Sequence, residues 1–254
     1  MPDPKWLNLF KKWVYASRTR NGLLQIALKG NQVECPCCGG TFITFLPAGL
    51  QKRANARCIR CGSLERHRSL WLFFREQKVL FSHSLRLLHV APERLYYRNF
   101  SRLKNIDYHP IDLNPDKYRY GPKTRRMDVT ALDFPDASFD VIICNHVLEH
   151  IREDRRAMGE MFRVLKPGGW AVLNVPVQME RAATFEDPAI SDPQKQMELF
   201  GQPDHVRVYG KDYVDRLQAA GFRVEILDFN KKFSPEDQFR FGLKPGELIF
   251  YCSK

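Results

Sequence analysis

Four of the seven cysteines stand in two closely spaced pairs, Cys35-Pro-Cys-Cys38 and Cys58-Ile-Arg-Cys61, with 19 residues between the pairs. A Cys-x2-Cys turn directs two thiolates at one ion, so this spacing predicts a zinc site of the ribbon type. Four thiolates leave no coordination position for water, and we therefore expect a structural Zn²⁺ bound by Cys35, Cys38, Cys58 and Cys61. Cys37 could replace a neighbouring ligand, and a metal-free thiol cluster is the alternative to a zinc site.

Histidines and acidic residues in two other places could move a proton. His146, Glu149 and His150 follow an apolar run, and Asp204-His205 lies in a long polar connection. Histidine suits this role because its pKa is close to neutral. We predict His205 as a general base oriented by Asp204, with His146 and His150 as further catalytic candidates. A base is required only if the substrate must lose a proton.

From residue 85 onward, short apolar runs alternate with helical stretches, which predicts an α/β fold with a parallel sheet covered on both faces. The expected strands are 85–91, 106–112, 124–128, 139–144, 169–175, 222–228 and 247–252, and the expected helices are 92–103, 152–165 and 211–220. We expect no helix in Asn230–Gly246, so the last strand should run antiparallel.

A long polar connection spans residues 177–210, and long structured loops often carry function. Within it, Arg207 and Tyr209 could bind an anionic or sugar-like substrate. An ordinary surface loop is the alternative interpretation.

The N-terminal third is strongly basic. Residues 1–80 contain 14 Lys/Arg and 4 Asp/Glu, a surplus of +10 out of the +11 of the whole chain. Such asymmetry indicates an anionic partner or a solvated basic face. Within it, residues 4–29 are expected to form an amphipathic helix that lies on a membrane surface or packs on its own protein. Its apolar face would consist of Trp6, Leu9, Phe10 and Trp13.

These observations divide the chain into three parts. Residues 1–30 form the basic helix, residues 31–80 the four-cysteine module with a linking helix from Ser63, its expected N-cap, and residues 81–254 the α/β domain. No run approaches the ~20 apolar residues of a membrane helix, and the start lacks the apolar run of a secretory signal. We expect a cytoplasmic protein without a transmembrane segment or disulfides.

Four segments of the α/β part together resemble the class I S-adenosylmethionine-dependent methyltransferases (Rossmann-like, type 11). Leu85–Glu93 stands at the family's first strand and cofactor loop, and Ile111–Pro115 at the end of its second strand. Met127–His150 is similar to its third-to-fourth-strand segment, and Leu165–Gly169 to the turn before its fifth strand. The resemblance implies a seven-stranded, mostly parallel sheet with an antiparallel last strand, here preceded by the zinc module, and S-adenosylmethionine as cofactor.

The resemblance also implies roles for individual residues. Asp112 would accept hydrogen bonds from the cofactor ribose, Asp128 would accept from the adenine amino group, and Asn145 and His146 would line the methionine end. The full set implied for cofactor binding is His89, Ala91, Glu93, Asp112, Leu113, Asp128, Val129, Asn145 and His146.

The first loop departs from the family pattern, because His89-Val-Ala91-Pro-Glu93 replaces an acidic residue followed by Gly-x-Gly. We expect Glu93 to bind the cofactor's ammonium group in place of missing backbone contacts, or to favour the start of the following helix. The loop and the cysteine pairs together resemble a group of bacterial methyltransferase-like sequences.

Three functions agree with these observations. The first is methyl transfer to a small molecule, a sugar or a lipid-linked metabolite. The second is methylation of RNA that docks on the basic module through phosphate contacts of Arg53, Arg57, Arg60, Arg66 and Arg68. The third is a non-catalytic binding module with a degenerate cofactor loop.

Overall fold

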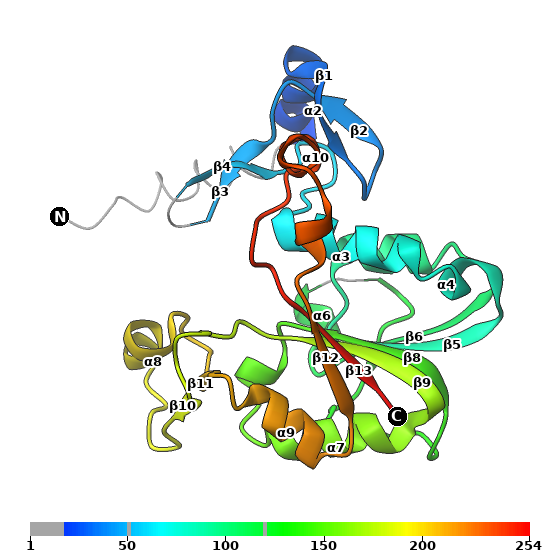
Figure 1. Ribbon diagram of the computed structural model, residues 1–254, viewed down its shortest axis with the longest axis vertical. Coiled ribbons are helices and arrows are strands. Elements are labelled where there is room, and N and C mark those ends of the chain that lie inside the picture. The colour runs from blue at the N-terminus through cyan, green and yellow to red at the C-terminus, as the bar shows by residue number, and fades with distance from the viewer. Residues whose placement is uncertain (1–17, 50–51, 119–120) are drawn as a thin grey trace. The chain divides into compact units, whose positions relative to one another are not determined.

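A computed structural model describes residues 18–49, 52–118 and 121–254 and divides into two compact units (Figure 1). The four-cysteine unit contains the chain up to Glu76 together with Phe229–Glu247, and the sheet unit contains Gln77–Asp228 and Leu248–Lys254. The apolar residues predicted to line the N-terminal helix, Trp6 to Trp13, lie outside the described residues, and only its last part is seen, as α2 (Arg18–Ala27).

The sheet unit is built on the expected seven-stranded sheet, in the order β12-β13-β9-β8-β5-β6-β7. Strands β5 to β9 run parallel where they pair, and β13 runs antiparallel to both β12 and β9. This topology confirms the class I methyltransferase sheet predicted from the sequence. The strands are β5 (Leu85–Val90), β6 (Ile106–Asp112), β7 (Arg125–Arg126), β8 (Phe139–Asn145), β9 (Leu165–Asn174), β12 (Arg223–Leu227) and β13 (Ile249–Ser253).

Helices cover this sheet because each turns one apolar face inward. In α7 (Asp154–Val164), Ala157, Met158, Met161 and Val164 repeat at helical spacing and are buried in the main core. Burying each larger side chain stabilises the fold by roughly 1.5–3 kcal/mol. Figure 1 shows α7 and α9 (Tyr213–Ala219) on one face of the sheet and α4 (Val79–Ser82) on the other. The unit also contains the short helices α5 (Arg94–Phe100) and α6 (Pro115–Tyr118) and the 3₁₀ turn η1 (Leu148–His150).

The long connection after β9 has structure of its own. Strands β10 (Phe185–Glu186) and β11 (Arg207–Val208) pair antiparallel, with α8 (Pro193–Phe200) between them. The Asp192 carboxylate accepts from the first amides of α8, and Gly201 ends the helix at φ 85°.

Among its described residues, the four-cysteine unit contains two small hairpins, three α-helices and one 3₁₀ turn. Strand β1 (Lys29–Cys35) pairs with β2 (Gly40–Phe42), and β3 (Leu46–Ala48) pairs with β4 (Arg53–Arg57). The linking helix α3 (Glu65–Glu76) is shorter than the predicted 63–80. Ser63 is not the N-cap of α3, which begins at Glu65. The Ser63 hydroxyl lies 3.1 Å from the sulfur of Cys35, and the Leu64 amide donates to the His67 ring.

Residues 229–247 contain η2 (Phe229–Lys232) and α10 (Pro235–Phe241), so the expectation of no helix here was wrong. The Ser234 hydroxyl accepts from the Asp237 amide, Pro235 occupies the first turn, and Gly242 ends the helix at φ 57°. From its position in the sequence, this segment was expected to belong to the α/β domain, but its contacts place it in the four-cysteine unit. Within the described ranges, no helix is long and apolar enough to cross a membrane.

Candidate functional site

A cavity of about 660 Å³ opens at the carboxyl ends of the parallel strands of the sheet unit. It begins where β5 ends, at Val90 and Ala91, and continues past the ends of β6, β7 and β8. The strand order reverses at β5, and ligands of open α/β sheets bind at such a switch point. The lining also includes Leu113, Asn114, Met127, Val129, Thr130, His146, Val147, His150, Ile151, Arg152, Glu153 and Asp204.

Two carboxylates face this cavity from neighbouring strand ends, as predicted. One oxygen of Asp112 accepts from the Asn114 amide at 2.6 Å, and one oxygen of Asp128 accepts from both the amide and the hydroxyl of Thr130 at 2.8 Å. These bonds fix each side chain and leave its second carboxylate oxygen for a ligand. Burial raises the pKa of Asp112 despite the Asn114 contact, because the carboxylate has lost hydration.

The loop after β5 bends sharply without glycine. Ala91 adopts a φ of 46°, and its amide donates to the Ile111 carbonyl at 2.8 Å. A non-glycine residue with positive φ stores roughly 1–3 kcal/mol of strain, and such strain concentrates at functional sites. The small Cβ of Ala91 lines the cavity, so a ligand can approach this backbone closely.

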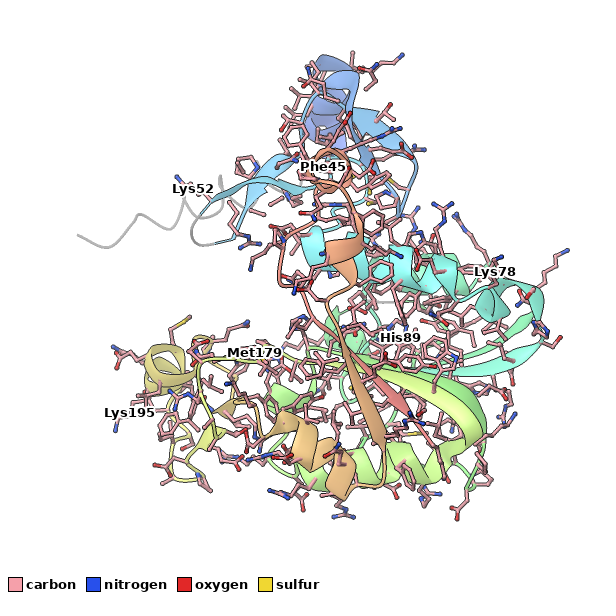
Figure 2. All side chains as sticks on the ribbon, viewed as in Figure 1. Phe45, Lys52, Lys78, His89, Met179 and Lys195 are labelled. Atoms are coloured by element: carbon pink, nitrogen blue, oxygen red, sulfur yellow. The ribbon has the colours of Figure 1, made fainter. Side chains whose placement is uncertain are left out.

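His89, near the end of β5, and Glu93, at the start of α5, are not among the residues that line the cavity. His89 is buried within the sheet unit (Figure 2), where its ring contacts the Tyr108 hydroxyl at 2.9 Å and the Glu93 carboxylate at 3.1 Å. This chain of contacts connects β6 to the start of α5. In the structure Glu93 therefore holds His89, and its contact with a cofactor ammonium group stays a prediction.

Strand β8 ends at Asn145, which is buried and is not among the residues that line the cavity, and His146 follows it. Both polar atoms of the Asn145 amide are buried without a hydrogen-bond partner. His146 lines the cavity with a φ of 53°, and its ring lies 3.3 Å from the Glu149 carboxylate. Buried amide groups are rarely left unpaired in a native protein, so Asn145 is a group that a bound ligand could satisfy.

Three histidines and two acids gather at one end of the cavity. The side chains of Glu149, His150 and His205 each bring one ligand atom within 4.8 Å of the others. The Asp204 carboxylate lies 3.5 Å from His150, so Asp204 contacts His150 and not the predicted partner His205. Burial lowers the pKa of His205, which keeps its imidazole neutral near pH 7. His150 and Asp204 line the cavity directly, and His205 stands behind them.

Arg207 and Tyr209 do not face a substrate, contrary to the interpretation of the polar connection. The Arg207 guanidinium is buried and donates to the carbonyls of Leu148, Ile151 and Arg152. It also contacts Glu186 at 2.7 Å. The Tyr209 hydroxyl donates to Asp154 at 2.8 Å, and Arg216 contacts the same carboxylate at 3.0 Å. This buried ion-pair cluster fixes the backbone that carries His150.

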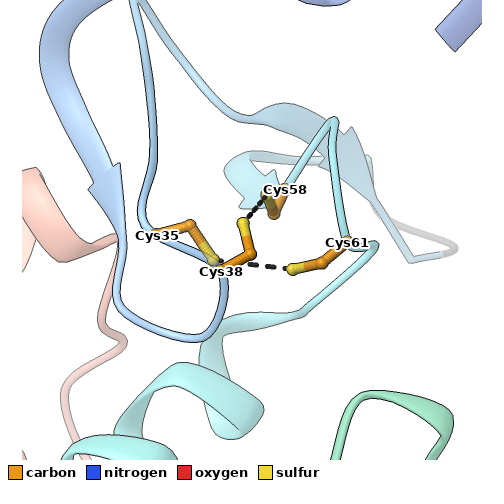
Figure 3. Close-up of side chains that lie close together, drawn as sticks. All are labelled: Cys35, Cys38, Cys58 and Cys61. Carbon is orange, nitrogen blue, oxygen red and sulfur yellow. Dashed lines mark hydrogen bonds between the residues drawn. The ribbon is translucent and has the colours of Figure 1, made fainter. Parts of the chain in front are cut away.

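The four predicted zinc ligands converge in the four-cysteine unit (Figure 3). The sulfurs of Cys35 and Cys61 are 3.6 Å apart, and those of Cys38 and Cys58 are 3.8 Å apart. Tetrahedral ligands at a Zn–S distance of about 2.3 Å lie about 3.8 Å from one another, so the sulfurs have room for Zn²⁺. Gly39 and Gly62 close the two turns with positive φ, as expected.

Cys37, which stands between the two cysteines of the first pair, does not converge with the other four sulfurs. The Cys37 thiol is buried and lies 3.6 Å from the His67 carbonyl, and it is not in the group that converges. Hydrogen bonds from neighbouring thiols, that of Cys37 first, lower the pKa of Cys35. Cys144 and Cys252 are buried in strands of the sheet, as the sequence predicted.

Two of the five arginines proposed for phosphate contacts are used inside the protein. Arg68 is fully buried, and Arg53 forms a two-pronged ion pair with Glu65 at 2.8 and 3.2 Å. A guanidinium that is already paired cannot bind phosphate without losing those contacts. For Arg68 the phosphate role is therefore wrong.

Some residues that line the cavity were not predicted from the sequence. Thr130 fixes Asp128, and its position two residues after an aspartate at a strand end is a signal for such a turn. Arg152 and Glu153 line the cavity from the turn after η1, where no sequence signal separates them from surface charges.

Comparison with known proteins agrees with this geometry. Residues 90–173 match a family described as a methyltransferase domain. A probable S-adenosylmethionine-dependent methyltransferase of Mycolicibacterium smegmatis is 31% identical over 127 residues, which are 49% of this chain and 44% of that protein. The uncharacterized methyltransferase YcgJ of Bacillus subtilis is 35% identical over 77 residues, 30% of this chain and 28% of YcgJ. The chain thus spans less than half the length of these curated relatives.

Among solved structures, an S-adenosylmethionine-dependent methyltransferase from Mesorhizobium loti superimposes with a TM-score of 0.49 at 17% identity, over 73% of this chain and 98% of that one. Residues 90–173, which match the methyltransferase-domain family, extend from the end of β5 into β9 of the seven-stranded sheet.

Proposed function

We propose that this protein transfers a methyl group from S-adenosylmethionine to a small-molecule acceptor. The observation that carries the proposal is the cavity at the switch point, with Asp112 and Asp128 at adjacent strand ends. Its volume lies within the range of small-molecule and cofactor sites, roughly 300–1,000 Å³. Bound S-adenosylmethionine supplies a sulfonium methyl group that is open to in-line attack.

The residues of the chain would bind and orient this cofactor. The second oxygen of Asp112 accepts from ribose hydroxyls, and that of Asp128 accepts from the adenine amino group, while Val129 and Leu113 pack beside the ring. The unpaired Asn145 amide gains a polar partner at the methionine end. Ala91 allows close approach of the loop that normally carries glycine.

The acceptor would enter at the end of the cavity where His146, His150 and Asp204 face inward. Holding two reactants in line can supply a large part of the rate. An acceptor hydroxyl must also lose its proton, and this end carries the histidines that can promote the loss. His205 would act from behind His150 and not against the acceptor itself.

A small acceptor is favoured over RNA by the arginines of the four-cysteine unit. Arg68 and Arg53 are occupied internally, which reduces the basic surface that the sequence offered for phosphate. Binding of a labelled RNA that weakened steeply with added salt would favour the RNA alternative instead.

Calorimetric titration with S-adenosylmethionine tests the proposal. Loss of two hydrogen bonds to a charged acceptor removes about 1.5–3 kcal/mol each. An amide recovers part of this, so Asp112→Asn should weaken binding about 10–100-fold. Asp133→Asn is the matched control, because the Asp133 side chain is 92% exposed. No binding by folded wild type would favour the non-catalytic binding module, and equal binding by Asp112→Asn would remove the ribose contact.

For the four-cysteine unit we propose structural zinc bound by Cys35, Cys38, Cys58 and Cys61. The proposal is supported by sulfur separations that suit tetrahedral Zn²⁺. Zinc of this type contributes on the order of 10–16 kcal/mol of apparent binding energy to small domains. Purified protein should contain about one zinc per chain, Cys58→Ser should lose it, and the control Cys37→Ser should keep it. Zinc in Cys58→Ser at the wild-type level would contradict this ligand set.

A further inference from the structure

A second group of metal-ligand side chains lies in the sheet unit, beside the proposed cofactor cavity. Glu149, His150 and His205 each offer one ligand atom, and these atoms lie within 4.8 Å of one another. Glu149 and His150 come from η1, and His205 comes from the loop after α8. The Val206 amide donates to the Glu149 carbonyl at 2.9 Å, which fixes the two segments side by side.

Two atoms of this group are buried and lack a partner among the described residues. The Glu149 side chain is 2% exposed, and its Oε2 accepts no hydrogen bond. His205 is 6% exposed, and its Nε2 is also unpartnered. Burying a carboxylate oxygen without a partner is costly, and a cation placed between these atoms would remove that cost.

The orientation of both imidazoles also fits ligation. The Nδ1 atom of His205 lies 3.2 Å from the Phe200 carbonyl, and that of His150 lies 3.1 Å from the Asp204 carbonyl. Each Nδ1–H can donate to its carbonyl, which leaves the Nε2 lone pair of each ring available. Histidine ligands of metals are commonly oriented by such a contact from their other ring nitrogen.

We propose that Glu149, His150 and His205 bind a divalent transition-metal cation that also holds the oxygen of the methyl acceptor. Two imidazoles and one carboxylate suit Zn²⁺ or Fe²⁺ and leave coordination positions open. His150 lines the cavity, so an open position can face a ligand there. The buried cluster of Arg207, Arg216 and Asp154 holds the backbone of η1 in place behind the site.

This inference rests on the proposed methyl transfer and narrows its acceptor to a hydroxyl or phenol. A bound cation acts as a Lewis acid and lowers the pKa of a coordinated hydroxyl. The acceptor O–H would release its proton to water, and the oxygen would form a bond to the methyl carbon as the bond from that carbon to sulfur breaks. The sulfonium charge is then neutralised, and the demethylated cofactor leaves as a thioether.

Cobalt(II) titration of full-length protein, treated with a chelator until one zinc per chain remains in the four-cysteine unit, tests the site, with absorption as the readout. Co²⁺ bound by imidazole and carboxylate gives weak ligand-field bands, whereas Co²⁺ bound by four thiolates adds intense charge-transfer bands. We expect about one equivalent with ligand-field bands alone in wild type. Glu149→Gln and His205→Gln should each weaken this binding at least about 100-fold, because each removes one of three ligands.

His83→Ala is the matched control, since His83 is an exposed histidine of the same unit, and it should bind Co²⁺ like wild type. Wild type without the ligand-field bands, or variants that keep them, would overturn the proposal. Calorimetric titration of the same samples with S-adenosylmethionine separates the metal-site hypothesis from the methyl-transfer hypothesis. Cofactor binding without Co²⁺ binding refutes only the metal site, and Co²⁺ binding without cofactor binding refutes only the proposed methyl transfer.

Discussion

Replacement of Arg68 by methionine should destabilise the four-cysteine unit more than any surface substitution. Its guanidinium is fully buried and donates to four backbone carbonyls at 2.6–2.9 Å. Two of these carbonyls belong to Ala56 and Ser63, beside the second cysteine pair, and two belong to Phe241 and Gly242, at the end of α10. One side chain thus connects the second cysteine turn to a segment more than 170 residues away.

The size of the effect follows from these contacts. The guanidinium carbon also lies 4.3 Å from the centre of the Phe45 ring, which Figure 2 labels in this unit. Methionine keeps much of the apolar packing but removes the guanidinium donor from the carbonyls of Ala56 and Gly242, whereas the Ser63 carbonyl keeps the Cys58 amide at 2.9 Å. Each unpaired group costs about 1–3 kcal/mol, and local relaxation recovers some of that, so we expect a loss of about 3–5 kcal/mol.

Urea unfolding of the full-length protein, followed by release of zinc to a coloured chelator, measures this loss. Zinc should leave Arg68→Met at clearly lower urea than wild type. Arg75→Met is the matched control, because Arg75 is an exposed arginine of the same helix, and it should stay within about 0.5 kcal/mol of wild type. Arg68→Lys should recover little of the lost stability, since one ammonium group cannot donate to several carbonyls in the fixed planar geometry of a guanidinium. Equal urea midpoints for Arg68→Met and wild type would refute the reasoning.

Three further predictions concern the sheet unit. Asp154→Ala removes the buried carboxylate that Tyr209 and Arg216 contact but leaves both arginines paired with Glu186, so thermal unfolding should show a loss of about 1–3 kcal/mol; an unchanged melting temperature would contradict the structural role of this cluster. Ala91→Gly relieves the positive φ and should raise stability by up to about 1 kcal/mol in the same assay, whereas a clear drop would argue against strain there. Burial raises the pKa of Asp112, so its ionisation weakens the ligand-free fold as pH rises through that pKa. Asp112→Asn should therefore melt higher than wild type at pH 7, and the two melting curves should converge as pH falls through the acid range; a constant difference at every pH would contradict this.

Much of the sheet unit could be predicted from the sequence because its determinants are local. The apolar runs that become β5, β6 and β8 are short and continuous, as expected for strands buried on both faces. Spacing alone also predicted which four cysteines converge, since two tight turns need only a few residues each to direct their sulfurs inward. Asp112 and Asp128 were found because a carboxylate at the end of a strand marks the edge where parallel strands end together.

Local signals were also overlooked. Ser234, Pro235 and Gly242 mark the start and end of α10, yet the polar character of the segment hid a helix of seven residues. The assignment of Ser63 as an N-cap failed for a different reason. Its hydroxyl lies against Cys35, a residue 28 positions away in the sequence, and no local pattern records that contact.

The tertiary structure alone decided which distant residues meet. The sequence placed Asp204 with His205 because they are neighbours in the chain, but adjacent side chains in an irregular loop can point in different directions. In the fold Asp204 contacts His150, while His205 turns toward Glu149 and His150. Likewise, Arg207 and Tyr209 are part of a buried cluster, because the pairing of β11 with β10 brings Arg207 to Glu186, and the Tyr209 hydroxyl donates to Asp154. Residue types and spacing thus determined the strands, the four converging cysteines and the two carboxylates, whereas long-range packing determined the histidine cluster, since its members converge only after the connection from β9 to α9 has folded back.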